Sequence, residues 1–275
     1  MKTIILPTDF SPAATNAVNY GVDMALAINA SVMLLHVYNI PVAIGDVPIV
    51  LLSVEELKKT AEDHIAELKK SIEHVTSGKL KIYTETRLGN VIDELQDVCK
   101  KIHPFAVVMG TTGTSGVERT LFGSNTLTAI RHLTSPVICV PRGKEYGQGI
   151  HKIGLACDFR EVATTTPTRE IISFVNEFKA KLFVLNVDYD NRQFKPDTPE
   201  QSAILHEALE PVQPSYHFIT RHDIEDGIND FAESHNLDLV IAIPKKHKLL
   251  EGLFKKSSTR QLVFESHVPV MCVHE

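Results

Sequence analysis

Long hydrophobic runs and metal-binding spacings are both missing from this sequence. Its apolar runs are much shorter than the roughly 20 residues that a helix needs to cross a bilayer, which argues against a membrane protein. Its four cysteines and thirteen histidines stand at no metal-ligand spacing, so we expect free, buried thiols in a reducing compartment. Met1-Lys2-Thr3 leads directly into a strand pattern rather than into the apolar core of a signal peptide. These absences predict a cytoplasmic protein without a metal site.

Positive charge is scarce as well. The chain has 28 lysines and arginines against 34 aspartates and glutamates, for a net charge of −6. Because proteins that bind DNA or RNA depend on a basic face, we expect no nucleic-acid partner. One local basic cluster, between Lys245 and Lys256, is open to two interpretations. It is either a solvated rim or a surface for an anion or a partner.

The common catalytic and nucleotide-binding signatures are also missing. There is no G-x-x-x-x-G-K-[ST] loop, and no G-x-G-x-x-G that opens a helix after a strand. There is no G-x-S-x-G elbow, and no cysteine has a sequence context that suggests activation. The sequence therefore does not support enzymatic turnover.

An internal repeat is the main feature that the sequence does contain. The strand pattern of residues 3–10 returns at residues 152–159, and both copies end in Asp-Phe. The pattern of residues 135–140 returns at residues 268–273, with a cysteine at the same place in each copy. In both halves, aliphatic and β-branched runs alternate with segments of helical spacing, which is typical of a parallel sheet built from βα units.

We therefore predict two tandem open-sheet α/β domains, over residues 1–143 and 150–275, joined by a polar, glycine-rich linker. Each domain should contain five strands alternating with four helices, with ligands bound beyond the carboxyl ends of the strands. The last strands of the two halves, residues 137–140 and 270–273, are apolar and would each leave an open sheet edge. We expect them to pair, so that the halves pack as an internal pseudo-dimer.

A group of glycines follows one predicted strand. After residues 105–109 come Gly110, Gly113 and Gly123, and Ser124 then opens a helical stretch. Glycine lets the main chain approach a polyphosphate closely, and the amino end of a helix favours an anion. Ser124 is expected to cap that helix, over residues 125–132. Each glycine alone is most simply a turn former, but three at one strand end favour a phosphate cradle.

The spacing Gly110-x2-Gly113-x9-Gly123-Ser124, with Pro7-Thr8-Asp9 closing the first strand, resembles the nucleotide-binding signature of the universal stress protein family. The order of elements covers the chain twice, as in tandem members of that family. The resemblance implies a sheet order of 3-2-1-4-5 with helices on both faces, and pairing of domains through the last strand. It also implies an adenine nucleotide, usually ATP, with or without Mg²⁺. One departure is Thr111-Thr112, where many members have Ser with His or Arg.

The resemblance assigns a role to each residue of this site. The wall on the adenine or ribose side would be formed by Pro7, Thr8 and Asp9, and the adenine pocket would be lined by Val37. The ribose would lie over Met109 and Gly110, and the phosphates would be held by Gly113, Gly123, Ser124 and Asn125. Two alternatives stay open: Asp9 as a turn carboxylate, and Val37 as a plain core residue.

The second half departs from the signature at every glycine. Ile243, Lys246 and Lys256 stand where the first half has its three glycines, and Pro244 removes a backbone donor. We therefore predict a cytoplasmic ATP-binding module of the stress response, with nucleotide in the N-terminal half only. The alternatives are an interaction scaffold that binds no nucleotide and a slow ATPase. Further homodimerisation is compatible with the resemblance, and the sequence does not identify the protein partner.

Overall fold

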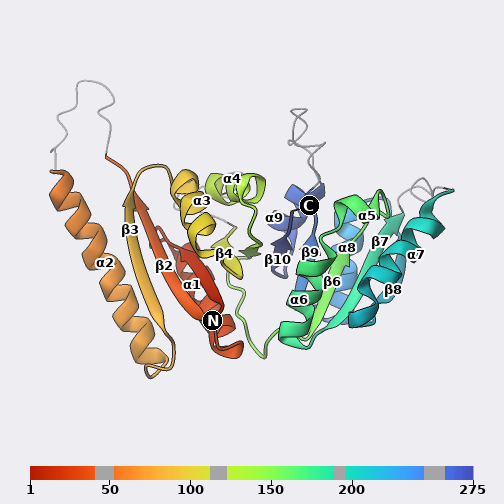
Figure 1. The fold of residues 1–275 in the computed structure, drawn as a ribbon, viewed down its shortest axis with the longest axis horizontal. Helices are drawn as coiled ribbons and strands as arrows, with labels where there is room; N and C mark the ends of the chain where they lie inside the picture. The colour runs from red at the N-terminus through yellow and green to blue at the C-terminus, as the bar shows by residue number, and fades with distance from the viewer. Residues whose placement is uncertain (41–52, 112–122, 189–195, 245–257, 275) are drawn as a thin grey trace. The chain divides into compact units, whose positions relative to one another are not determined.

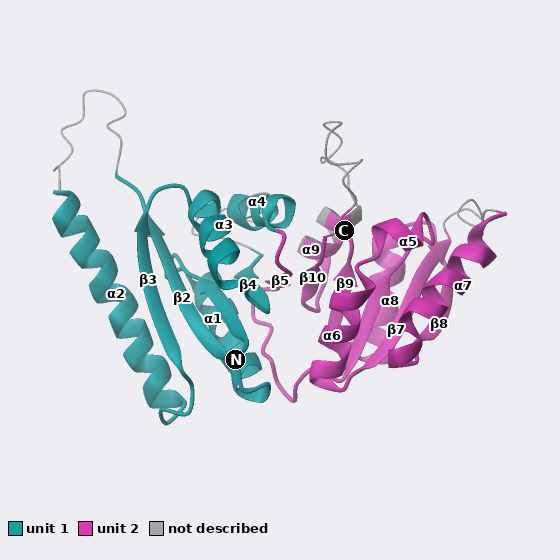
Figure 2. Cartoon of the chain, in the orientation of Figure 1, with its two compact units in different colours: residues 1–133 teal, residues 134–275 magenta. Residues whose placement is uncertain are grey.

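The computed structural model describes residues 1–40, 53–111, 123–188, 196–244 and 258–274 (Figure 1). The chain divides into two compact units, Met1–Leu133 and Thr134–Glu275 (Figure 2). Both units combine parallel strands with helices, which confirms the predicted tandem α/β architecture. None of the helices in these ranges is long and apolar enough to cross a membrane.

The described residues of the first unit form four parallel strands in the order β3-β2-β1-β4. The strands are β1 (Thr3–Pro7), β2 (Ser31–Tyr38), β3 (Ile82–Leu88) and β4 (Ala106–Gly110). The helices are α1 (Pro12–Ala27), α2 (Val54–Val75), α3 (Val91–Ile102) and α4 (Ser124–His132). The strand order reverses between β1 and β4, and ligands of open α/β sheets bind at such a switch point.

Helices cover both faces of this sheet. The connections through α1 and α2 run outward to β3, whereas the connection through α3 runs back to β4. Because crossovers between parallel strands are right-handed, α1 and α2 lie on one face and α3 on the other. The amino end of α1 forms as the sequence indicates: Ser11 Oγ accepts a hydrogen bond from the Ala14 amide at 3.2 Å, and Pro12 is the first helical residue.

In the second unit, the part of the chain that the structure describes forms six strands in the order β5-β10-β9-β6-β7-β8. The strands are β5 (Val137–Val140), β6 (Lys152–Ala156), β7 (Lys181–Asp188), β8 (Ser215–Thr220), β9 (Leu239–Ala242) and β10 (Val270–Cys272). Strands β6 to β10 are all parallel, and their order is the predicted 3-2-1-4-5. The helices are α5 (Val162–Thr165), α6 (Thr168–Phe178), α7 (Thr198–Leu209), the short 3-10 turn η1 (Glu210–Val212), α8 (Ile224–His235) and α9 (Ser258–Glu265).

The last strands of the two repeats pair with each other, as predicted. Strand β5 lies antiparallel to β10, with Cys139 opposite Val270 and Cys272 opposite Val137. Directly opposed residues share a face, so both cysteines lie diagonally on one face of this pair. A hydrogen bond with Cys272, together with burial, raises the pKa of the Cys139 thiol well above its usual range. All four cysteines are free thiols, but Cys157 is only half-buried, contrary to the expectation that all are buried.

One helix differs between the repeats. The connection from β1 to β2 is the single helix α1, whereas the connection from β6 to β7 is split into α5 and α6. Pro167 precedes the first residue of α6, and proline supplies no amide hydrogen to continue a helix. The described residues of the second half therefore include one helix more than the four that its sequence pattern predicts.

Candidate functional site

The turn after β1 opens the carboxyl edge of the first sheet. The Thr8 amide donates to the Leu35 carbonyl at 2.9 Å, and Thr8 Oγ1 accepts from the Phe10 amide at 3.0 Å. His36 Nδ1 lies 2.8 Å from the Thr8 carbonyl; because a carbonyl only accepts, this nitrogen carries the proton. Thr8 is thus buried and fully engaged in the turn, while Asp9 is exposed beside it.

Asp9 has the turn role that the sequence leaves open. Its Oδ1 accepts a hydrogen bond from the Ser11 amide at 3.0 Å. The next residue, Phe10, has a φ of 61°, and its ring packs against the rings of His36 and His64 at centroid distances of 4.6 and 5.5 Å. The turn is therefore fixed by contacts on both sides, and Asp9 is held at the edge of the sheet next to the start of α1.

Gly110, at the end of β4, lies against the start of α1. A Cβ at this position would come 2.7 Å from the Ala13 carbonyl oxygen and 3.0 Å from its carbon. The absence of a side chain here thus lets α1 approach the strand. Met109, which precedes it, is buried.

Gly123 packs just as closely against its own chain. Its amide donates to the Thr111 carbonyl at 3.1 Å, and a Cβ would lie 3.2 Å from both Thr111 O and Thr126 Oγ1. The buried Thr126 hydroxyl donates to the Gly110 carbonyl at 2.8 Å. These bonds tie the first turn of α4 to the end of β4, so the two glycines belong to one structural unit.

The prediction that Ser124 caps the following helix is wrong. Helix α4 begins at Ser124 itself, and its N-cap is Gly123, whose carbonyl accepts the first helical hydrogen bond, from Leu127 at 3.1 Å. Among the described residues no side chain caps this end, and no acidic residue lies in its first turn. Ser124 and Asn125 are exposed there. An uncapped amino end with this composition is suited to an anion.

Val37 lies near the end of β2 and is half-buried, so it is not an ordinary core residue. It is paired directly with Arg87 of β3. Paired residues of parallel strands share a face, and Arg87 bonds to side chains of α3, so Val37 also faces α3.

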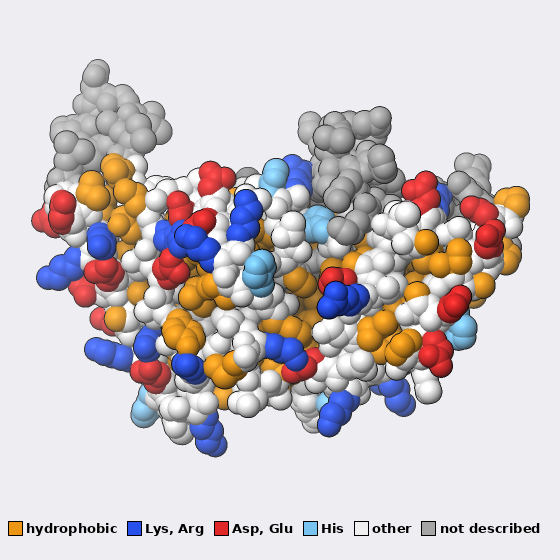
Figure 3. All heavy atoms as spheres, viewed as in Figure 1, with side chains coloured by type: hydrophobic (Ala, Val, Ile, Leu, Met, Phe, Trp, Pro, Cys, Tyr) orange, Lys and Arg blue, Asp and Glu red, His pale blue; other side chains and the backbone are white. Residues whose placement is uncertain are grey.

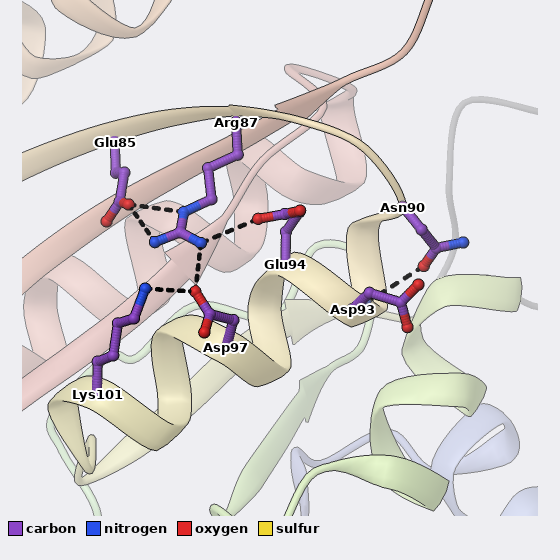
Figure 4. A network of polar contacts seen from close by, with 7 residues as sticks. All are labelled: Glu85, Arg87, Asn90, Asp93, Glu94, Asp97 and Lys101. Atoms are coloured by element: carbon purple, nitrogen blue, oxygen red, sulfur yellow. Dashed lines mark hydrogen bonds and ion pairs between the residues drawn. The ribbon is translucent and has the colours of Figure 1, made fainter.

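Arg87 is the centre of a polar network that sequence reasoning missed (Figure 4). Its Nε donates to Glu85 Oε1 at 2.6 Å, and its Nη1 donates to Glu94 Oε2 at 2.9 Å and to Asp97 Oδ2 at 2.6 Å. These bonds raise the pKa of Arg87 above its usual value, with Glu94 the largest cause. Asp97 also accepts from Lys101 at 2.7 Å, and this bond, followed by that with Arg87, lowers the pKa of Asp97. The sequence signal that could have indicated part of this network is the spacing of Glu85 and Arg87. They are two residues apart in a strand, which places both side chains on one face of β3.

The remaining predicted residue of the phosphate cradle, Gly113, lies outside the described residues, as do Lys246 and Lys256 of the second half. Pro7 ends β1 and is half-buried. The described residues thus bring together, at one edge of the first unit, the turn after β1, Val37, Gly110 and the start of α4.

The second unit keeps the turn of the first but not its glycine. The Cys157 amide donates to Leu185 O at 2.9 Å, and Asn186 Nδ2 donates to Cys157 O at 2.9 Å, which matches the bonds around Thr8. Leu239 pairs with Ile153 as Ala106 pairs with Ile4, so Ile243 takes the position of Gly110.

Two further surface features complete this description. A groove of about 650 Å³ lies along α8 of the second unit; it is lined by Ile219, Arg221, Gly227, Asp230, Phe231, Glu233 and Ser234. Figure 3 shows acidic and basic side chains intermixed over α2 and α3, without a field of one sign on that face. Within the described ranges, no three His, Cys, Asp or Glu residues are grouped so that they could hold a metal ion.

The chain is similar to known proteins over both halves. The sequence model of the universal stress protein family matches residues 1–141 and 149–274. A universal stress protein of Methanocaldococcus jannaschii is 30% identical over 147 residues, which are 52% of this chain and 84% of that protein. A universal stress protein of Archaeoglobus fulgidus has the same fold, with a TM-score of 0.77 and 18% identity over 99% of this chain and 98% of its own. A putative universal stress protein of Pseudomonas aeruginosa has a TM-score of 0.65 and 10% identity, over 99% of this chain and 93% of its own. The chain therefore belongs to the universal stress protein family, as a member with two tandem domains.

Proposed function

We propose that this chain is an ATP-binding regulatory protein of the cytoplasmic stress response, and that its N-terminal half holds the nucleotide. The observation that carries the proposal is the start of α4. Within the described part of the chain it has no side-chain cap, its first turn holds no acidic residue, and it lies beside Gly110 at the switch point of the sheet. Such an end offers amide hydrogens and the positive end of the helix dipole to phosphate oxygens.

The rest of the edge suits the other parts of ATP. Val37, half-buried and apolar, would contact the base, and the exposed Asp9 would accept from ribose hydroxyls or the base. Ser124 and Asn125 would add polar side chains at the phosphates. Mg²⁺, if bound, would take its ligands from phosphate oxygens and water, because this cation usually keeps several waters.

The second half is proposed to bind no nucleotide. At the position of Gly110 it has the half-buried Ile243, followed by Pro244, which has no amide hydrogen. The first half has no room for a side chain at this strand end, because α1 packs against Gly110, so the second half cannot form the same edge around Ile243. We expect this half to regulate or recruit a protein partner.

Calorimetric titration of the chain with Mg-ATP tests the proposal, and we expect saturation near one equivalent. Asp9→Ala should weaken this single binding event. Asp158→Ala is the matched control, because each aspartate holds the same turn: Asp158 Oδ1 accepts from the Arg160 amide at 3.1 Å. We expect that control to leave the affinity unchanged. Two equivalent sites, or a larger response to the Asp158 change, would overturn the assignment, and absence of binding would refute ATP as the ligand.

A further inference from the structure

The Arg87 network lies next to the proposed base site. Val37 and Arg87 are direct partners across β2 and β3, and both face α3. Adjacent strands are about 4.8 Å apart, so a base in contact with Val37 would have Arg87 beside it on the next strand. The network is partly shielded from solvent, with 18% of the Arg87 side chain and 28% of the Glu94 side chain exposed.

This network offers acceptors rather than donors. The guanidinium is occupied on all three nitrogens, since Nε and Nη2 contact Glu85 and Nη1 contacts Glu94 and Asp97. The network contains the three carboxylates of Glu85, Glu94 and Asp97. It contains only two cations, Arg87 and the Lys101 ammonium that bonds to Asp97. A donor group on a ligand therefore meets carboxylate oxygens here, and an acceptor group meets negative charge.

One oxygen of the network lies at the ends of the strands. Glu94 Oε2 is bound by Arg87, whereas Oε1 lies 3.0 Å from the point where a Cβ on Gly89 would be. Gly89 follows β3 directly, and its amide donates to the carbonyl of Tyr38, the last residue of β2, at 3.1 Å. Oε1 is thus at the edge where the two strands end, and no hydrogen bond to it occurs among the described residues.

We propose that Glu94, held in place by Arg87, selects the base by accepting a hydrogen bond from the 6-amino group of adenine; this rests on the proposed function. Arg87 is the positioning residue, because its bond to Oε2 fixes the orientation of the carboxylate and leaves Oε1 for the ligand. A hydrogen bond to a charged group contributes enough free energy for a selectivity of about 10- to 100-fold. Figure 4 shows Glu94 one turn into α3, between Arg87 and the helix start at Asn90.

The test removes the donor from the ligand and the acceptor from the protein in turn. The ligands are ATP and purine riboside triphosphate, which has hydrogen in place of the 6-amino group. For the wild-type chain we expect ATP to bind about 10- to 100-fold more tightly than the purine analogue. In Glu94→Ala the two ligands should bind within about 3-fold of each other, because the energetic coupling between the two groups is lost.

Asp97→Ala is the matched control. It also removes one carboxylate from Arg87, but Asp97 lies a turn further along α3, so the preference for ATP should stay at the wild-type value. If Glu94→Ala does not fold by circular dichroism, Glu94→Gln is measured in the same way, and its preference should fall because a neutral amide accepts more weakly. An unchanged preference in the Glu94 variant, or an equal loss in Asp97→Ala, would overturn the inference while ATP binding stands. A wild-type chain that binds no ATP would instead refute the proposed function itself.

Discussion

Gly110→Ala tests whether the glycine at the end of β4 is needed by the fold itself. The added Cβ would lie 2.7 Å from the Ala13 carbonyl oxygen, whereas an ordinary contact is 3.4 Å or more. Since the obstacle is backbone, the amino end of α1 must withdraw by about 0.7 Å. Overpacking of this kind costs about 1–3 kcal/mol. Alanine also loses less chain entropy than glycine on folding, which offsets about 0.4–1 kcal/mol.

The net expectation is a loss of about 1–2 kcal/mol in the free energy of unfolding. For a chain of this size, that loss lowers the melting temperature by about 2–8 °C. The assay is thermal unfolding followed by circular dichroism, without nucleotide, so that a loss reports packing and not ligand contact.

Gly154→Ala is the control. Its Cβ would be almost as close to a neighbour, at 2.8 Å, but that neighbour is the Leu237 Cδ1 methyl, the end of a side chain that can rotate away. We expect this variant to lose less stability than Gly110→Ala. If the two variants melt alike, or if Gly110→Ala is the more stable, the close approach of α1 does not explain the glycine.

Two further predictions concern stability. Thr126→Val removes the 2.8 Å bond to the Gly110 carbonyl from a buried position, and should lower the free energy of unfolding by about 1–3 kcal/mol in urea titrations; an unchanged value would show that the bond contributes nothing. Burial and, second, the nearby His235 lower the pKa of His217 from its usual 6.5. As the pH falls below about 6.5, the imidazole of His217 therefore binds a proton in the unfolded chain before it does so in the folded chain. The free energy of unfolding should fall with the pH for this reason, and it should fall less steeply in His217→Gln than in wild type. Equal slopes in urea midpoints between pH 7.5 and 5.5 would contradict this.

Patterns of strands and helices could be predicted from the sequence because they are repeated and locally encoded. Buried strand runs and the Ser11-Pro12 helix start depend on neighbouring residues, and the apolar last strands indicated their own pairing. The start of α4 was misplaced by one residue, because both Gly123 and Ser124 are acceptable N-caps. Only the backbone conformation decides between them.

Other features depend on contacts between distant segments. Nothing in the local sequence of Arg87 indicates that Glu94 and Asp97 of α3 bind it. In the same way, a glycine pattern does not distinguish room for a phosphate from room for the protein's own backbone. At Gly110 the structure assigns that room to α1, next to the edge where we propose that the ligand binds.

The split of α5 from α6 changes what supports the helix start in the second repeat. In the first repeat, the residue that Gly110 faces, Ala13, lies in the 16-residue helix α1. The matching residue of the second repeat, Val162, lies in α5, which has only four residues. A helix this short is not stable by itself. The Val162 amide donates to Gln201 Oε1 of α7 at 2.8 Å, so this turn of the second repeat depends on a neighbouring helix for the support that the first repeat has within one helix.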